Sequence, residues 1–213
     1  MAQNQHSTAG LILAGGRGER LGGVIKSELM VGGVRLLERV AVQLEGCAPL
    51  LVAHGRIEPA ALHLAARMTA VPDLDGDYAG PLAGFAGAIA YINTLAEPPE
   101  LLISVAVDTP FLPSDFATRL VDGLGEAAAA IAAYDGQPYP TNAIWRVVRF
   151  RDLPDQVRTG TAPRSLKSLC AAVGGAIVEW PHSAAGDPFA NVNTPEELDN
   201  LRQRATADGV VRR

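Results

Sequence analysis

The sequence predicts a three-layer α/β domain in which helices cover both faces of a mostly parallel sheet. Short apolar runs of strand length alternate along the chain with segments of helical spacing, as they do in βαβ units. The apolar runs also lack the in-and-out alternation of a strand with one wet face, which is typical of strands covered on both sides. A chain of 213 residues, 48% of them hydrophobic, can bury the core of one such domain.

Each element is expected from its own local pattern. The apolar runs that predict strands are 10–13, 50–53, 68–71, 101–107, 127–133 and 176–179. The segments with helical spacing are 36–44, 59–66, 82–95, 114–124 and 165–173. The alanine-rich run 127–133 is compatible with a core strand or a helix end on periodicity alone. A last helix begins after Thr194, with Pro195 in its first turn and Glu197 completing a capping box.

Composition and charge exclude several classes of protein. A net charge of −5 argues against a surface that tracks nucleic-acid phosphates. No apolar stretch approaches the roughly 20 residues that span a membrane, and residues 1–8 lack a signal-peptide pattern, so a cytoplasmic protein is expected. Cys47 and Cys170 are isolated in sequence, which favours buried, reduced thiols. We expect a flexible segment at 1–8, the domain at 9–205 and a tail at 206–213.

A glycine-rich loop follows the first predicted strand. The segment 11–26 reads LILAGGRGERLGGVIK: an apolar run, then glycines interleaved with Arg17 and Arg20, and finally Lys26. Glycines let a backbone approach phosphate and point its N–H groups at it, while basic side chains neutralise the charge. The alternative is a glycine-rich surface turn with solvated arginines. The combination of strand, glycines and three basic residues favours a phosphate-binding loop.

This loop matches neither of the two common nucleotide-binding motifs. Gly16, Gly18 and Gly22 give G-x-G-x-x-x-G, one residue longer than the dinucleotide fingerprint. A P-loop requires glycine directly before its Lys-Ser/Thr pair, whereas Ile25 precedes Lys26 here. The sequence therefore indicates a different kind of phosphate site.

Asp108 follows the apolar run 101–107, where a strand is expected to end. In open parallel sheets, ligands bind at the carboxyl ends of the strands. An aspartate there can simply cap the Thr-Pro turn that follows. A nucleoside triphosphate, however, brings Mg²⁺, which proteins hold with one or two carboxylates and phosphate oxygens. We therefore predict that Asp108 holds Mg²⁺.

Several motifs, in this order, resemble those of the MobA-like nucleotidyltransferases. They are Leu13-Ala-Gly-Gly16 with Arg20-Leu-Gly-Gly23 and Lys26, Asp77-Tyr-Ala-Gly-Pro-Leu-Ala-Gly84, Val107-Asp-Thr-Pro-Phe-Leu-Pro113, Tyr139-Pro-Thr141 and Phe189-Ala-Asn-Val-Asn-Thr-Pro-Glu-Glu-Leu198. More narrowly, the chain resembles the molybdenum cofactor guanylyltransferases, which transfer GMP from GTP to molybdopterin and release pyrophosphate. The resemblance implies a Rossmann-like sheet of the nucleotide-diphospho-sugar transferase type.

The resemblance also implies roles for individual residues. Catalysis is expected from Lys26, Arg20 and Asp108, with Mg²⁺ on Asp108. Nucleotide binding is expected from Leu13, Ala14, Gly15, Gly16, Arg17, Gly18, Lys26, Asp73, Gly80, Pro81, Leu82 and Gly84. Within that set, Asp73 would accept hydrogen bonds from a guanine edge and Gly84 would leave room for a base. The neighbouring Asp75 and Asp77 are interpreted from their loop position as surface charges. The substrate to be guanylylated would contact Asn191, Asn193, Pro140 and Thr141.

The chain departs from the family pattern at two places. Ile25 stands where the family has aspartate, and the segment 161–167 replaces a common Glu-Arg-Arg stretch. A cytidylyltransferase, a sugar-phosphate nucleotidyltransferase and a non-catalytic nucleotide- or cofactor-binding protein therefore stay open as alternatives. Retention of the three catalytic candidates favours an enzyme. The expected partners are GTP, molybdopterin, and cofactor-biosynthesis proteins or acceptor molybdoenzymes, with no nucleic acid and no membrane.

Overall fold

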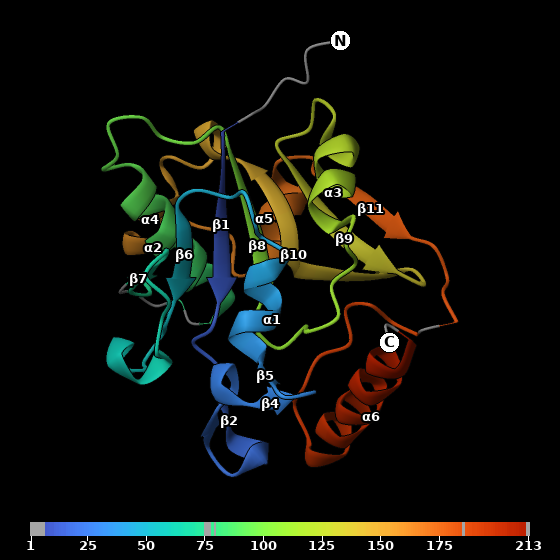
Figure 1. Cartoon of the computed structure of the whole chain (residues 1–213). Helices are drawn as coiled ribbons and strands as arrows, with labels where there is room; N and C mark the ends of the chain where they lie inside the picture. Colours follow the sequence, from blue (N-terminus) through green and yellow to red (C-terminus); the bar gives the residue numbers. More distant parts are fainter. Residues whose placement is uncertain (1–6, 75–77, 79, 185, 212–213) are drawn as a thin grey trace.

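A seven-stranded sheet forms the middle layer of the structure, with the strand order β11-β9-β10-β8-β1-β6-β7. The computed structural model describes residues 7–74, 78, 80–184 and 186–211, and Figure 1 shows their arrangement. The strands are β1 (Thr8–Leu13), β6 (Leu50–Ala53), β7 (Met68–Val71), β8 (Leu101–Ala106), β9 (Ala129–Tyr134), β10 (Gln137–Arg146) and β11 (Ala176–Trp180).

Most neighbouring strands of this sheet run parallel. β1 pairs in parallel with both β6 and β8, β6 with β7, and β11 with β9. β10 is the exception, because it runs antiparallel to β8 and β9. After β1, the chain moves outward through β6 and β7 and then returns to place β8 on the other side of β1. The strand order thus changes direction at β1.

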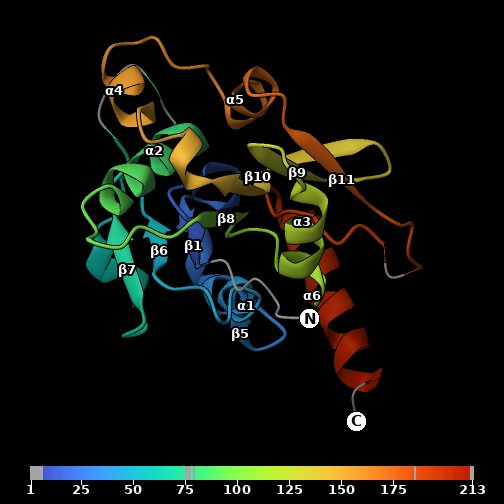
Figure 2. The same cartoon turned by 90° about the horizontal axis from the view of Figure 1, so that it is seen from above.

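Helices cover both faces of the sheet, as Figure 2 shows from above. One face carries α1 (Leu36–Val42), α3 (Phe116–Leu124) and α6 (Pro195–Val211). The other carries α2 (Pro81–Ile92), α4 (Leu153–Arg158) and α5 (Leu166–Ala172). These three layers confirm the predicted α/β class with a mostly parallel sheet.

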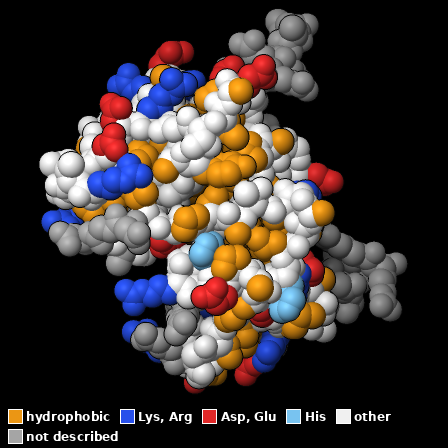
Figure 3. Space-filling view, turned by 90° about the vertical axis from the view of Figure 1, so that its left-hand side faces the viewer, with side chains coloured by type: hydrophobic (Ala, Val, Ile, Leu, Met, Phe, Trp, Pro, Cys, Tyr) orange, Lys and Arg blue, Asp and Glu red, His pale blue; other side chains and the backbone are white. Residues whose placement is uncertain are grey.

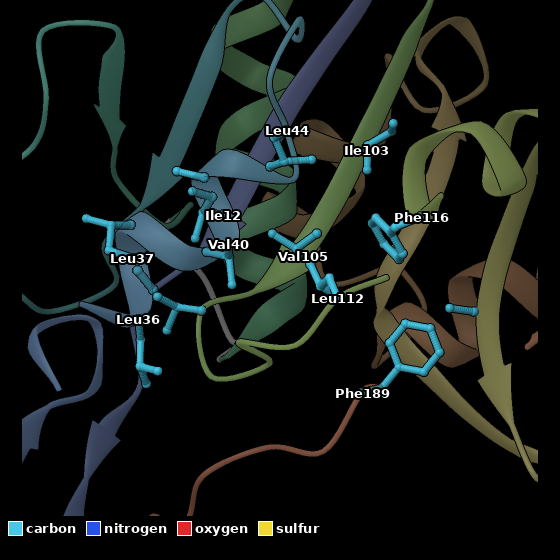
Figure 4. Packing of buried hydrophobic residues seen from close by; sticks show 14 of the residues in the cluster. Ile12, Leu36, Leu37, Val40, Leu44, Ile103, Val105, Leu112, Phe116 and Phe189 are labelled. Atoms are coloured by element: carbon cyan, nitrogen blue, oxygen red, sulfur yellow. The ribbon is translucent and has the colours of Figure 1, made fainter. Parts of the chain in front are cut away.

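The two faces of the sheet bury separate hydrophobic clusters. Ile12 of β1 packs with residues of α1 and α3, among them Val40 and Phe116, in the cluster that Figure 4 shows. Its neighbour Leu11 faces the other way, into the cluster that contains Phe85 of α2 and Trp145 of β10. Successive strand residues point to opposite faces. A central strand with both faces covered must therefore be continuously apolar, which is the pattern that predicted β1.

The predicted strands and most of the predicted helices are present. The alanine-rich run forms strand β9. The segment 59–66 is not an α-helix: it contains only the short 3-10 helix Pro59–Leu62, and His63 then adopts a φ of 44°. Sequence reasoning missed β10, in which Pro138 and Pro140 interrupt the apolar pattern, and the short helix α4. Helix α6 continues to Val211, into the segment assigned to the tail.

The capping box predicted for α6 is confirmed. The backbone N–H of Glu197 donates to Oγ1 of Thr194 at 3.2 Å, and the Glu197 carboxylate accepts the N–H of Thr194 at 3.0 Å. The same carboxylate oxygen accepts the N–H of Asn193 at 2.6 Å. This reciprocal arrangement satisfies N–H groups that a helix start otherwise leaves without partners. It also fixes the backbone on which Asn193 stands.

The surface side chains agree with the composition. On the face that Figure 3 shows, hydrophobic, basic and acidic side chains are interspersed. Among the described residues, no helix is long and apolar enough to cross a bilayer.

Both cysteines are free, but only Cys170 is buried as predicted, whereas Cys47 is partly exposed. Burial raises the pKa of the Cys47 thiol to about 11 and also raises that of Cys170.

Candidate active site

The site lies at the carboxyl end of β1, where the strand order reverses. The loop after β1 and the turn after β8 leave the sheet at neighbouring positions on this edge, since Leu13 pairs with Ala106. In Figure 1 the glycine-rich loop, which contains β2, lies below the end of β1. Such a switch point opens the crevice in which doubly wound α/β proteins bind their ligands. The fold therefore brings the predicted phosphate loop and Asp108 to one edge.

The glycine-rich loop folds into a small hairpin. Its strands β2 (Arg17–Gly18) and β3 (Val24–Ile25) are antiparallel, and Gly22 and Gly23 turn the chain with φ of 80° and 78°. Positive φ at two successive residues is accessible to glycine at little cost. Arg20 lies at the exposed tip of this hairpin. The side chain of Arg17 is outside what the structure describes.

Lys26 joins three distant segments of the chain. It begins the 3-10 helix η2 (Lys26–Glu28) directly after the hairpin. Its Nζ donates to Oδ2 of Asp108 at 2.6 Å and to Oδ1 of Asn193 at 2.7 Å. The Lys26 and Asp108 side chains are only 10% and 16% exposed, so water screens this ion pair less than a surface pair. The geometry thus places three predicted site residues, one from each segment, in direct contact.

Two backbone segments touch beneath the loop. A Cβ placed on Gly15 would lie 2.8 Å from Cα of Gly55, in the turn after β6. This approach is closer than any side chain permits, so Gly15 is fixed by contact between main chains. At the next residue, Gly16, the nearest atom to an added Cβ is Cδ of Lys26 at 3.9 Å, an ordinary contact distance.

Gly15→Ala is expected to destabilise the fold by about 1–3 kcal/mol, the usual cost of an overpacked contact. The two turns must move apart to accommodate the methyl group. Gly16→Ala is the matched control, because its methyl group meets no backbone atom. The free energy of unfolding in urea measures both variants. Equal values for the two would show that the contact between Gly15 and Gly55 contributes nothing to stability.

Asp73 follows strand β7 and contacts the same turn. Its Oδ1 accepts the N–H of Gly55 at 3.1 Å. Burial raises the pKa of this carboxyl, partly offset by the Gly55 hydrogen bond and the nearby His54. Gly84 of α2 lies against it: a Cβ there would be 3.2 Å from Oδ1 of Asp73 and 2.9 Å from Cβ of Ala53. Protein atoms therefore fill the space beside Gly84, and helix packing explains this glycine.

The start of α2 supplies the other predicted nucleotide contacts. Gly80 is exposed and adopts φ 73° and ψ −149°, which favours glycine. Pro81 follows at the first helical turn and is exposed, whereas Leu82 is buried in the core. Asp75, Asp77 and Ala79 lie outside the described residues, so only Tyr78 of this stretch is described before Gly80.

The residues predicted to contact the second substrate lie on two elements. Asn193 reaches Lys26, whereas Asn191 is exposed at the surface. Pro140 and Thr141 are half-buried on β10, where the register with β9 shifts between Tyr139 and Ala143.

Sequence reasoning missed a further polar residue beside this segment, Asn142. It is completely buried, and its Oδ1 accepts the N–H of Ala106 at 3.0 Å, just before Asp108. An asparagine at the start of the apolar stretch 143–145 was the available signal.

The donor set at this edge fits a divalent cation only together with a ligand. Among the described residues, no three His, Cys, Asp or Glu side chains cluster tightly enough to hold a metal ion by themselves. Asp108 supplies one carboxylate, of which Oδ2 is bound to Lys26. Mg²⁺ commonly takes one or two carboxylates and completes its coordination with waters and substrate phosphates. A single aspartate beside a phosphate loop matches this pattern.

The fold and the site define an α/β protein with a glycine-rich loop, a lysine and an aspartate at the switch point of its sheet. The MobA-like NTP transferase domain family matches residues 10–205, and the chain therefore belongs to this family. This finding confirms the resemblance seen in the sequence motifs.

The similar proteins extend over nearly the whole chain. The molybdenum cofactor guanylyltransferase of Rhodobacter capsulatus is 37% identical over 212 residues, covering 92% of this chain and 98% of that protein. Its namesake from Nitrobacter hamburgensis is 32% identical over 207 residues, covering 95% and 96%.

Solved structures share the fold. Molybdopterin-guanine dinucleotide biosynthesis protein A from Archaeoglobus fulgidus superposes with a TM-score of 0.65 at 23% identity, covering 94% of this chain and 99% of that one. Rv0371C of Mycobacterium tuberculosis in complex with manganese superposes with a TM-score of 0.64 at 16% identity, covering 93% and 98%.

Proposed function

We propose that this protein transfers GMP from GTP to molybdopterin and releases pyrophosphate, as a molybdenum cofactor guanylyltransferase. The observation that supports this most directly is the contact of Lys26 with both Asp108 and Asn193 beside the glycine-rich loop. The relatives with 32% and 37% identity over most of the chain bear this name. The proposal keeps the cytoplasmic location expected from the sequence.

The geometry supports the proposed roles of the loop and its basic residues. The backbone of Ala14–Gly18 binds the triphosphate, since it lies at the carboxyl end of a parallel strand and contains three glycines. Lys26 is placed at the inner end of the loop and Arg20 at its exposed tip. Both would offset the negative charge that develops on pyrophosphate as it leaves. Preorganised charges of this kind are usually the largest contribution of an enzyme to such a reaction.

The transfer itself needs no nucleophile from the protein. An oxygen of the molybdopterin phosphate attacks the α-phosphorus of GTP, and the bond from that phosphorus to the bridging oxygen of pyrophosphate breaks. The attacking oxygen is anionic at neutral pH, so no side chain has to remove a proton from it. Catalysis then consists of orientation and charge stabilisation. Asn191, Asn193, Pro140 and Thr141 are the residues proposed to orient the molybdopterin.

Mg²⁺ is the proposed metal, and Asp108 would hold it. When bound, such a cation neutralises phosphate charge and polarises the phosphoryl oxygens. Rv0371C of Mycobacterium tuberculosis, which shares the fold and is described as a manganese complex, supports a divalent cation on this fold.

Nucleotide choice tests the proposal. GTP should react in preference to CTP, ATP and UTP, measured as pyrophosphate release with molybdopterin and Mg²⁺. Asp73→Asn should reduce the preference for GTP over ATP about 10- to 100-fold, because the amide replaces an acceptor of the guanine N–H groups by a donor and removes the charge. The amide oxygen can still accept the N–H of Gly55, so the turn should be retained.

The other outcomes identify the alternatives. A faster reaction with CTP would support a cytidylyltransferase. Tight GTP binding without transfer would indicate a non-catalytic nucleotide-binding protein. An unchanged preference in Asp73→Asn would remove Asp73 from the guanine site but leave the reaction itself standing.

A further inference from the structure

Asn142 holds the backbone turn that leads from β8 to Asp108. Its side chain is completely buried. Oδ1 accepts the N–H of Ala106 at 3.0 Å and lies 3.4 Å from Oγ1 of Thr109. The Thr109 hydroxyl also donates to the carbonyl of Ala106 at 2.8 Å. Asp108 therefore lies within a turn whose two ends, Ala106 and Thr109, meet at one side-chain oxygen.

The Asn142 side chain supplies a hydrogen-bond acceptor just beyond the end of the pairing between β8 and β10. The antiparallel pairing of β10 with β8 runs from Arg146 and Leu101 to Ala143 and Ser104. Beyond that pair the register of β10 is irregular, so no backbone carbonyl of β10 pairs with Ala106 in a regular ladder. The N–H of Ala106 receives its acceptor from the Asn142 side chain instead.

The orientation of the amide follows from its partner. A backbone N–H can only donate, so the Asn142 oxygen must face Ala106 and the amide nitrogen must face away. Among the described residues, this Nδ2 has no hydrogen-bond partner, although it is buried. A buried donor without a partner destabilises a fold. An apolar residue would remove this penalty but leave the N–H of Ala106 without its side-chain acceptor. Since one unpaired donor would replace the other, hydrogen bonding gives an asparagine here little net stability, and its effect is on the turn.

We infer that Asn142, with Thr109, is a positioning residue that fixes the direction of the Asp108 carboxylate. The inference rests on the proposed role of Asp108 in holding the metal. Asp108 must contact Lys26 in the free protein and a cation in the complex, and both depend on where its backbone lies. Groups that orient a metal ligand from behind are typically worth 10- to 100-fold in metal affinity or activity.

The chain offers a matched set of variants. Asn142→Leu retains the branched shape of the side chain and removes the oxygen that contacts Ala106 and Thr109. Thr109→Val removes only the hydroxyl, and Thr109→Ser retains it. The control is Ser104→Ala, which deletes the buried hydrogen bond from Nε1 of Trp145 to Oγ of Ser104 at 2.9 Å. That bond joins the same two strands but lies before the turn.

Two measurements report on Asp108. The first is the dissociation constant of Mn²⁺ from the protein–GTP complex, followed by electron paramagnetic resonance. The second is the proton–nitrogen NMR signal of the Lys26 ammonium group in the free protein. This signal is visible when hydrogen bonds slow proton exchange with water. The chain has only two lysines, Lys26 and Lys167, so Lys167→Arg assigns the spectrum.

We expect Mn²⁺ affinity and the Lys26 signal to change only in the variants that remove hydrogen bonds of the turn. Asn142→Leu and Thr109→Val should weaken Mn²⁺ binding about 10- to 100-fold and shift or broaden the Lys26 signal. Thr109→Ser and Ser104→Ala should match the wild type in both. The inference is overturned if Thr109→Val, correctly folded, matches Ser104→Ala, or if all variants change only in proportion to their loss of stability. Failure of wild-type protein to transfer GMP would instead contradict the proposed function, because the NMR comparison needs no turnover.

Discussion

Replacing Lys26 with methionine should lower the rate of GMP transfer about a hundredfold or more while the protein still folds. The ammonium group lies 2.6 Å from Asp108 and 2.7 Å from Asn193, and its side chain is 10% exposed. A positive donor at this depth is worth most when negative charge develops on the leaving pyrophosphate. Methionine retains the apolar stem, so packing is preserved. Pyrophosphate release, with GTP varied, measures the effect.

Two further variants complete this test: one retains the positive charge at position 26 with a different geometry, and the other is a control at the second lysine. Lys26→Arg should not restore activity, because a planar guanidinium cannot place one compact nitrogen between two converging oxygen atoms. Lys167→Met changes the other lysine, which is exposed on α5, and should leave the rate unchanged. Wild-type turnover in correctly folded Lys26→Met would exclude Lys26 from the reaction.

The sequence was most informative where local pattern and tertiary environment agree. β1 and β8 are apolar except for Thr8 and Ser104, because helices cover both faces of the sheet at these strands. β10 could not be predicted in the same way. It runs antiparallel, contains two prolines near its start and is irregular between Tyr139 and Ala143. Its stability comes from pairing with β8 and β9, which no local window of sequence contains.

The sequence predicted at which edge of the sheet the site lies, but not which side chains contact one another there. Asp108 and Lys26 were both expected at the carboxyl ends of strands, and they form an ion pair there. The contact of Lys26 with Asn193 depends on how the chain returns from β11 to α6, so the motif indicated the residue but not its partner. Gly84 shows the reverse case: the motif suggested room for a base, whereas protein atoms fill that space.

Asp108→Asn should abolish most GMP transfer with little effect on the fold. Asparagine has nearly the same shape, and its oxygen can still accept the hydrogen bond of Lys26. The variant removes the negative charge that attracts a hard cation. Because Asp108 lies half-buried at the crevice and outside the hydrophobic clusters, packing should be retained, and the loss of stability should come only from the lost charge interaction with Lys26, about 1–3 kcal/mol. Urea unfolding measures this loss.

The metal dependence of pyrophosphate release decides the role of Asp108. If this carboxylate holds the cation, Asp108→Asn should require a much higher Mg²⁺ concentration, and excess Mg²⁺ or Mn²⁺ should recover only part of the rate. Asp122→Asn, at an exposed position of α3, controls for the loss of one negative charge and should respond as the wild type does. A reduced rate in Asp108→Asn with an unchanged Mg²⁺ requirement would place the metal elsewhere, because loss of a ligand must weaken the binding of the ion that it holds. Asp108 would then act on the reaction through its ion pair with Lys26.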